Sequence, residues 1–186
     1  FPLQGYSGTY YVLGGQDFQD RNQRRITGFK YVLPGSFESL DIPLRRGRPL
    51  LDTDRAGSAP VVVINETMAQ RNWPDGDPIG EQLVLYSGPL EIVGVVGDTK
   101  DAGADAGDLE TIFLPHLQRE ERFMDWAVEA SVPLGSLMEP VRMEVRALDP
   151  AVPAYDIMPM DDLIELSLGG DLIMAKIMSV LAVIAL

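Results

Sequence analysis

The chemistry open to this chain is limited first by the residue types that it lacks. Its 186 residues include no cysteine and one histidine, His116. Thiolate metal sites, iron–sulfur clusters and cysteine nucleophiles are therefore excluded, and a mechanism that needs an imidazole must use His116. No Gly-x-Ser-x-Gly motif supplies a serine nucleophile beside it. We therefore interpret His116, which follows Pro115, as a structural or surface histidine.

Nucleotide-binding motifs are absent or incomplete. The sequence has no Gly-x-x-x-x-Gly-Lys-Ser/Thr segment, which excludes a P-loop nucleotide hydrolase within this chain. Residues 94–97, Gly-Val-Val-Gly, lack the third glycine of a dinucleotide-binding turn and lead into an acidic loop instead of a helix. Close backbone packing in a sheet is the better interpretation of these glycines.

Hard oxygen ligands are concentrated in the small, polar segment 98–110. Asp98, Asp101, Asp105 and Asp108 are separated by three, four and three positions, whereas an EF-hand loop has acids at alternate positions, a central Gly and a distal Glu. A solvated loop is favoured, and weak calcium binding stays a hypothesis that calorimetry would dismiss if millimolar calcium gave no heat. Nothing marks out one carboxylate pair among 28 acidic residues, so we nominate no catalytic, cofactor-binding or metal-binding residue.

The charge balance argues against nucleic acid and anionic lipid as partners. Fifteen Lys and Arg against 28 Asp and Glu give a net charge of −13, which repels phosphate groups. The one basic cluster contains Arg45, Arg46 and Arg48. Guanidinium groups could bind an anion or a headgroup there, but internal pairing with acids such as Asp52 and Asp54 is the favoured interpretation.

Hydrophobic patterning predicts a mixture of strands and helices in the first two thirds of the chain. Residues 43–54 look like a loop, and residues 36–40 like one helical turn. A helix capped by Asn65 is expected to end at Trp73. Strands are predicted at residues 10–13, 28–33, 61–64, 82–86, 90–96 and 112–114, with a hairpin turn at 87–89.

The last third of the chain predicts a β-α-β unit over residues 126–158. Apolar and polar residues alternate over 126–132, as in a half-buried strand. Ser136 and Glu139 have the spacing of a capping box at the start of a helix over residues 136–148, and Pro140 lies in its first turn. A second strand is predicted at residues 152–158.

The C-terminal residues 172–186 form an apolar run interrupted by Lys176 and Ser179. As a helix this run would be about 22 Å long, shorter than the roughly 30 Å membrane core. It is either the start of a membrane span that is cut short, or an amphipathic core helix with those two residues on its polar edge.

Several segments, taken in order, resemble one family. They are residues 31–37 (Tyr-Val-Leu-Pro-Gly-Ser-Phe), 40–48 with Asp54, 62–69 with Trp73 and Pro74, 77–80 (Asp-Pro-Ile-Gly), 92–98, and 145–150 leading through 160–168 into the apolar run. Together they resemble the MacB-like periplasmic core domain of FtsX/MacB-type permeases of ABC transporters, over about residues 28–186. The resemblance also suggests that the first membrane helix and the first strand and helix of the domain precede Phe1.

The resemblance implies an α+β fold in two parts. A porter-like subdomain, residues 1–35 and 109–170, would contain the β-α-β unit, and a small, β-rich, sabre-like lobe, residues 36–108, would be inserted into it. Residues 171–186 would be the truncated start of a transmembrane helix. Gly47, Trp73, Pro78, Gly80 and Gly94 are expected to act as fold determinants, because Gly and Pro in turns serve backbone geometry.

The implied function is that of the extracytoplasmic domain of an ABC transporter permease in the bacterial inner membrane, without catalysis or a cofactor. Such a domain would couple ATP-driven motion of membrane helices to export or transenvelope signalling. The implied partners are a cytoplasmic ABC ATPase, a second permease copy or pseudo-dimer partner, and a periplasmic adaptor, with no nucleic acid. The alternative is a self-standing, soluble, ligand-binding α+β module. An acidic hydrolase is a third hypothesis.

Overall fold

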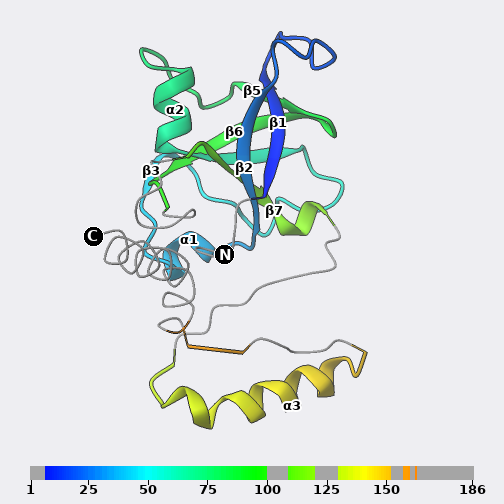
Figure 1. Ribbon diagram of the computed structural model, residues 1–186, viewed down its shortest axis with the longest axis vertical. Helices are drawn as coiled ribbons and strands as arrows, with labels where there is room; N and C mark the ends of the chain where they lie inside the picture. Colours follow the sequence, from blue (N-terminus) through cyan, green and yellow to red (C-terminus); the bar gives the residue numbers. More distant parts are fainter. Residues whose placement is uncertain (1–6, 100–108, 120–129, 152–156, 160–161, 163–186) are drawn as a thin grey trace, which may run out of the picture. The chain divides into compact units, whose positions relative to one another are not determined.

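The computed structural model describes residues 7–99, 109–119, 130–151, 157–159 and 162 (Figure 1). The chain divides into two compact units, Phe1–Met124 and Asp125–Leu186, and each is described by itself below. In the described ranges, no helix is long and apolar enough to cross a membrane. The predicted span over residues 171–186 lies outside these ranges.

The first unit is built on one mixed sheet of seven strands. Its strands are β1 (Gly8–Leu13), β2 (Arg25–Val32), β3 (Leu44–Gly47), β4 (Val61–Asn65), β5 (Gln82–Leu85), β6 (Gly88–Val96) and β7 (Thr111–Pro115). The predicted strands of this region are all present, and β5 and β6 form the predicted antiparallel hairpin. The loop predicted over residues 43–54 is wrong at 44–47, because the edge strand β3 pairs there with β6.

Six of these strands close into a ring. β2 and β7 run parallel, as do β4 and β6, while β1–β2, β1–β5, β5–β6 and β4–β7 are antiparallel. Strands from residues 8–32, 61–96 and 111–115 thus belong to one sheet. Hydrogen bonds therefore join strands on both sides of residues 36 and 108, the expected boundaries of the sabre-like lobe, and that division stays a prediction.

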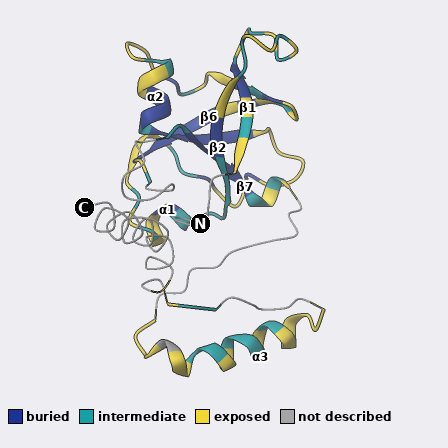
Figure 2. Cartoon of the chain, in the orientation of Figure 1, coloured by how far each residue is buried: buried dark blue, intermediate teal, exposed yellow. Residues whose placement is uncertain are grey.

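Alternating side chains build two apolar clusters on the two faces of the sheet. The interior cluster contains Tyr11, Val62, Ile64, Met68, Leu83, Leu85, Leu90, Ile92, Val95, Ile112 and Leu114, among others. The outer cluster contains Phe37, Leu50, Val61, Val63, Val93, Val96 and Phe113. Strand β4 serves both clusters, and all five of its residues are buried, as the unbroken apolar run predicts (Figure 2).

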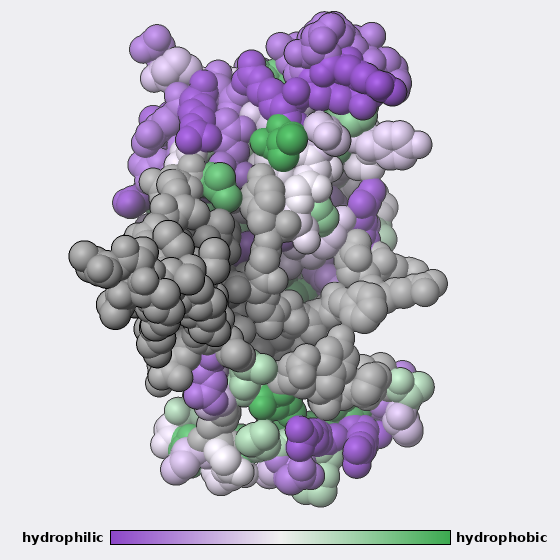
Figure 3. All heavy atoms as spheres, in the orientation of Figure 1, coloured by the Kyte–Doolittle hydropathy of each residue, from purple (hydrophilic) through white to green (hydrophobic). Residues whose placement is uncertain are grey.

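Two short helices pack on this sheet. α1 (Ser36–Ser39) brings Phe37 into edge-to-face contact with Phe113, with ring centroids 5.2 Å apart. α2 (Glu66–Asn72) begins at Asn65, whose side chain accepts a hydrogen bond from the Met68 N–H as the predicted cap. The surface over α2 and over the β1–β2 loop is hydrophilic in Figure 3.

The glycines among the predicted fold determinants act through the backbone. The ideal Cβ of an alanine at Gly94 would overlap the Arg48 carbonyl oxygen, and one at Gly47 would overlap the Val93 carbonyl oxygen. Gly47 and Gly80 also have positive φ angles of 70° and 85°. β3 therefore approaches β6 at a distance that only glycine allows, as expected for the glycines of residues 94–97.

In the second unit, α3 (Met138–Leu148) forms where a helix was predicted. The capping box is wrong, because Leu137 is the N-cap and the Ser136 hydroxyl donates to the Pro133 carbonyl instead, at 2.6 Å. The predicted strands at 126–132 and 152–158 lie mostly outside the described residues, and residues 130–132 and 157–158, which are described, form no strand.

Candidate functional site

The basic cluster is paired within the chain, as the favoured interpretation expects. Arg48 donates from Nη1 and Nη2 to the two carboxylate oxygens of Asp54, at 2.7 and 3.0 Å. Arg45 forms an ion pair with Glu66 at 3.3 Å, and Arg46 donates to the Gly76 carbonyl. Because these partners are internal, the cluster is explained by folding without a bound anion.

The carboxyl group of Asp54 is nearly buried, with 5% of the residue exposed. Burial alone would raise the pKa of Asp54. The hydrogen bonds from Arg48 and from the Leu51 N–H, together with the Arg48 charge, outweigh this effect and lower the pKa below its usual value. This bidentate pair holds Arg48, directly after β3, to Asp54 six residues further along the chain.

Of the four aspartates in the calcium hypothesis, Asp98 lies in the described part of the chain, and the other three lie outside it. Its Oδ1 accepts from the Asn65 side chain at 2.6 Å and from the Thr67 N–H at 3.0 Å, and its Oδ2 accepts from the Thr67 hydroxyl at 3.0 Å. Asp98 therefore has a structural role at the start of α2. Among the described residues, no group of three His, Cys, Asp or Glu side chains could hold a metal ion.

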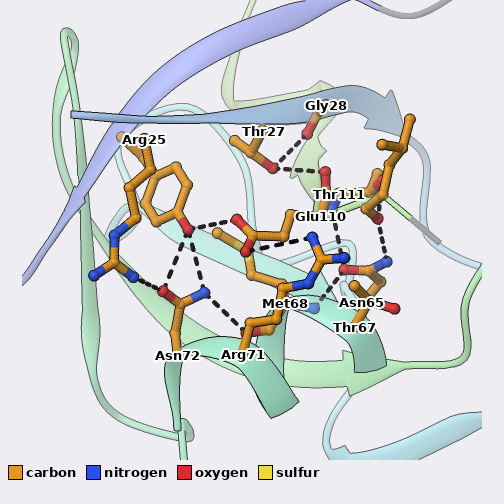
Figure 4. Close-up of polar contacts among 12 residues, drawn as sticks. Arg25, Thr27, Gly28, Asn65, Thr67, Met68, Arg71, Asn72, Glu110 and Thr111 are labelled. Atoms are coloured by element: carbon orange, nitrogen blue, oxygen red, sulfur yellow. Dashed lines mark hydrogen bonds and ion pairs between the residues drawn. The ribbon is translucent and has the colours of Figure 1, made fainter. Parts of the chain in front are cut away.

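The main polar feature of the first unit is a cluster at the point where β7 begins (Figure 4). We call it the polar cluster; it contains Tyr11, Asn65, Asn72, Asp98 and Glu110. These side chains come from β1, the end of β4, α2 and the segments that flank residues 100–108. The polar cluster lies at one end of the closed ring, where β2 and β7 start and β4 stops.

Asn65 uses all of its hydrogen-bonding capacity in the polar cluster. Its Oδ1 accepts from the N–H groups of Met68 and Thr111, at 3.1 and 3.0 Å. Its Nδ2 donates to Asp98 and to the Leu109 carbonyl, at 2.6 and 2.7 Å. The residue is 1% exposed. One side chain thus joins the start of α2 to the start of β7.

Glu110 is the second junction of the polar cluster. The Tyr11 hydroxyl donates to its Oε2 at 2.5 Å, and Arg71 lies 3.8 Å from its Oε1. Its backbone carbonyl accepts from the Gly28 N–H at 2.8 Å and from the Thr27 hydroxyl at 2.9 Å. Burial first, and then the hydrogen bond to the negative Glu110, raise the pKa of Tyr11 well above its usual value.

Asn72 completes the arrangement from the end of α2. Its Nδ2 donates to the Tyr11 hydroxyl at 3.2 Å and to the Met68 carbonyl at 3.0 Å. Arg25 of β2 also donates to it. In the described ranges, no buried polar side-chain atom lacks a hydrogen-bond partner. The polar cluster therefore positions four elements and has the character of a structural brace.

Sequence reasoning found part of this brace. Asn65 was identified as a helix cap, and Asp98 as a candidate ligand, but Tyr11, Asn72 and Glu110 gave no signal. Tyr11 is separated from them by 61 and 99 positions, so no local pattern connects these residues. His116 lies in the short 3-10 helix η1 (His116–Gln118), partly exposed and outside the polar cluster.

Two solved structures resemble this chain in fold. The periplasmic region of MacB from Actinobacillus actinomycetemcomitans has a TM-score of 0.61 at 16% identity, covering 86% of this chain and 71% of that chain. The extracellular domain of the noncanonic ABC-type transporter YknZ from Gram-positive bacteria has a TM-score of 0.54 at 15% identity, covering 84% and 83%. At such identities the likeness shows the fold.

The family follows from the sequence match. Residues 4–148 match the model of the MacB-like periplasmic core domain, and the chain belongs to this family. The recognition made from the ordered segments of residues 31–98 and 145–168 is confirmed, although the match begins and ends earlier than the expected range of 28–186. A curated relative, the pyoverdine export ATP-binding/permease protein PvdT of Pseudomonas syringae pv. tomato, is 33% identical over 70 residues, which are 37% of this chain. The chain spans about a tenth of that relative's length.

Proposed function

We propose that this chain is the extracytoplasmic part of an ABC transporter permease, held on the periplasmic side of the bacterial inner membrane by flanking helices. In this role it couples ATP-driven motion of the membrane helices to export or transenvelope signalling and carries out no covalent chemistry. The observation that carries the proposal is the family match over residues 4–148. This match favours the permease over a self-standing binding module.

The proposed partners belong to the longer protein or to its assembly. They are a cytoplasmic ATPase subunit or domain, a second permease copy or pseudo-dimer partner, and a periplasmic adaptor. An ATPase is supported by the name of the curated relative, which combines ATP binding with a permease. Which substrate is transported depends on the whole transporter and not on this domain alone.

The geometry of the first unit supports transmission of motion as a rigid body. Its strands close into a ring around the interior cluster, and close-packed interiors move as units instead of deforming continuously. The polar cluster ties the start of β7 to β1, β2 and α2. A displacement applied where β7 leaves the sheet would therefore move the whole ring.

Distance measurements in the full-length transporter test the coupling directly. Because this chain has no cysteine, Asp75→Cys gives a single exposed labelling position per copy of the domain. Pulsed electron paramagnetic resonance on the reconstituted transporter should show a different Asp75-to-Asp75 distance distribution with trapped ATP than without nucleotide. Unchanged distributions in a transporter that hydrolyses ATP would refute the coupling.

A second label position separates rigid-body motion from internal deformation. Glu38 and Asp75 are both exposed residues of the first unit. With Glu38→Cys and Asp75→Cys in one copy, diluted with unlabelled copies, the distance within that copy should be the same in both nucleotide states. If this distance changes as much as the distance between copies, the unit does not act as one body.

A further inference from the structure

The first unit contains a pocket at the strand ends opposite the polar cluster. Its volume is about 280 Å³. It is lined where β2, β5 and β7 end and where β4 and β6 begin, by Tyr31, Leu85, Leu114, Pro60 and Pro89 respectively. The family match and the brace described above assign no role to this pocket.

The floor of the pocket is apolar. Leu85, Leu90 and Leu114 line it, and they are 7%, 9% and 7% exposed as members of the interior cluster. Pro89 and Pro115 stand beside them in the lining, and proline has no backbone N–H to donate. The lower part of the pocket therefore favours a compact apolar group over a hydrogen-bonding one.

The rim is cationic in an otherwise acidic chain. Arg55 and Arg119 both line the pocket, and the described residues of its lining include no Asp or Glu, while the chain carries a net charge of −13. Arg119 donates to the Tyr31 hydroxyl at 2.9 Å. Within the described residues, the Arg55 guanidinium makes no hydrogen bond or ion pair. Two guanidinium groups are thus available to an anion.

Hydrogen bonds hold the wall of the pocket in place without a ligand. The Gln118 side chain donates to the Ser58 hydroxyl at 2.9 Å and to the Ala59 carbonyl at 2.8 Å. The Ala56 N–H donates to the Leu117 carbonyl at 2.8 Å. The loop that bears Arg55 is therefore fastened to η1, next to Arg119. Such preorganisation lowers the entropy that binding must overcome.

We propose that this pocket binds a small carboxylate with a compact apolar body, about the size of a leucine side chain. The apolar body rests on Leu85, Leu90 and Leu114, and the carboxylate lies between Arg55 and Arg119. A volume of 280 Å³ is close to the lower limit of about 300 Å³ for small-molecule pockets, which restricts the ligand to this size. Guanidinium groups match the planar geometry of a carboxylate.

The test uses N-acetyl-L-leucine as the probe and the full 186-residue chain as the protein. In a nuclear magnetic resonance titration, the backbone amides of Ala56, Leu90 and Arg119 should shift and saturate together. N-acetyl-L-leucinamide, which lacks the charge, and acetate, which lacks the apolar body, should each bind at least about tenfold more weakly. The variant Arg55→Gln/Arg119→Gln should weaken binding of the probe by a similar factor.

A matched control removes the same charge elsewhere. Arg45→Gln/Arg46→Gln also deletes two positive charges, but these residues pair with Glu66 and Gly76 and do not line the pocket. This variant should bind the probe as the unmodified chain does. Failure of N-acetyl-L-leucine to bind, equal binding of the acid and the amide, or equal loss in the control variant would overturn the proposal. None of these results would bear on the nucleotide-dependent motion in the proposed function.

Discussion

The clearest test of the brace is removal of the Asn65 side chain. Asn65→Ala deletes four hydrogen bonds at once, to Met68, Thr111, Asp98 and Leu109. Asp98 keeps its two bonds from Thr67, and the Leu109 carbonyl keeps one from the Thr111 hydroxyl at 3.2 Å. The Thr111 N–H, in a residue that is 3% exposed, is left without this partner.

The expected loss of stability follows from these groups. A lost helix cap costs about 1 kcal/mol, and a buried N–H without a partner costs about 1–3 kcal/mol. Asn65→Ala should therefore lower the free energy of unfolding of the first unit by about 2–4 kcal/mol. Asn65→Asp should be no more stable than Asn65→Ala. The aspartate keeps the acceptor oxygen of the cap, but its second carboxylate oxygen faces Asp98 in place of the Asn65 Nδ2, which lies 2.6 Å from the Asp98 Oδ1 in the unmodified chain.

Urea unfolding followed by tryptophan fluorescence measures this loss. The chain has two tryptophans, so a Trp126→Phe background leaves Trp73, which packs against the interior cluster, as the reporter of the first unit. The matched control is Asn22→Ala. Asn22 is an exposed residue of the β1–β2 loop, and its replacement should change stability by less than about 0.5 kcal/mol.

Two results would refute the reasoning. If Asn65→Ala lowers stability by no more than Asn22→Ala, the four hydrogen bonds do not hold the start of β7. If Asn65→Asp restores the full stability of the unmodified chain, the donor half of the side chain contributes nothing, and the contacts with Asp98 and Leu109 have been assigned a role that they lack.

Three further predictions concern packing and pH. Gly94→Ala should destabilise the first unit by more than about 2 kcal/mol in the same urea assay, because its Cβ would overlap the Arg48 carbonyl. The control is Gly76→Ala in the same unit, where a Cβ would make only ordinary contacts of 3.8 and 3.9 Å with Trp73. The folded-state pKa of Asp54 is lowered, so its contribution to the free energy of unfolding is complete above about pH 4 and is lost as pH falls below that. Asp54→Asn should therefore lower stability at pH 7 and make stability fall less steeply with acid. Equal slopes of stability against pH in the two proteins would contradict this. The folded-state pKa of Tyr11 is raised, so its contribution to the free energy of unfolding is present below about pH 10 and is lost as pH rises further. Above pH 10, the unmodified chain should therefore lose stability more steeply than Tyr11→Phe. In a spectrophotometric titration, one of the six tyrosines should ionise only on unfolding.

Local patterns predicted most of the elements of the first unit. The unbroken apolar run over residues 61–64 lies in a strand that is buried throughout, and Asn65 caps the helix after it, because both outcomes depend on residues within a few positions of each other. The exposed strand β3 was missed, since its four residues have no apolar periodicity. It is a strand because the edge of β6 supplies hydrogen bonds to it.

The pocket had no local signal, and in the polar cluster only Asn65 and Asp98 had one. Tyr11 and Glu110 are 99 positions apart, and Arg55 and Arg119 meet at one pocket only after β4 and β7 have paired. The capping box at Ser136 failed for a related reason. Its hydroxyl had a competing acceptor in the Pro133 carbonyl, which the spacing of Ser136 and Glu139 does not reveal.

By itself, the sequence determined the family, the acidic character of the chain, six of the seven strands of the first unit and the exclusion of thiol chemistry, because these depend on composition and on short, ordered segments. The tertiary structure decided that strands on both sides of the expected boundaries close into one ring, which of many carboxylates join the polar cluster, and that two arginines line the same pocket as three buried leucines. These features depend on strand pairing between distant segments. Pairing of that kind depends on the packing of the whole unit and not on any small set of residues.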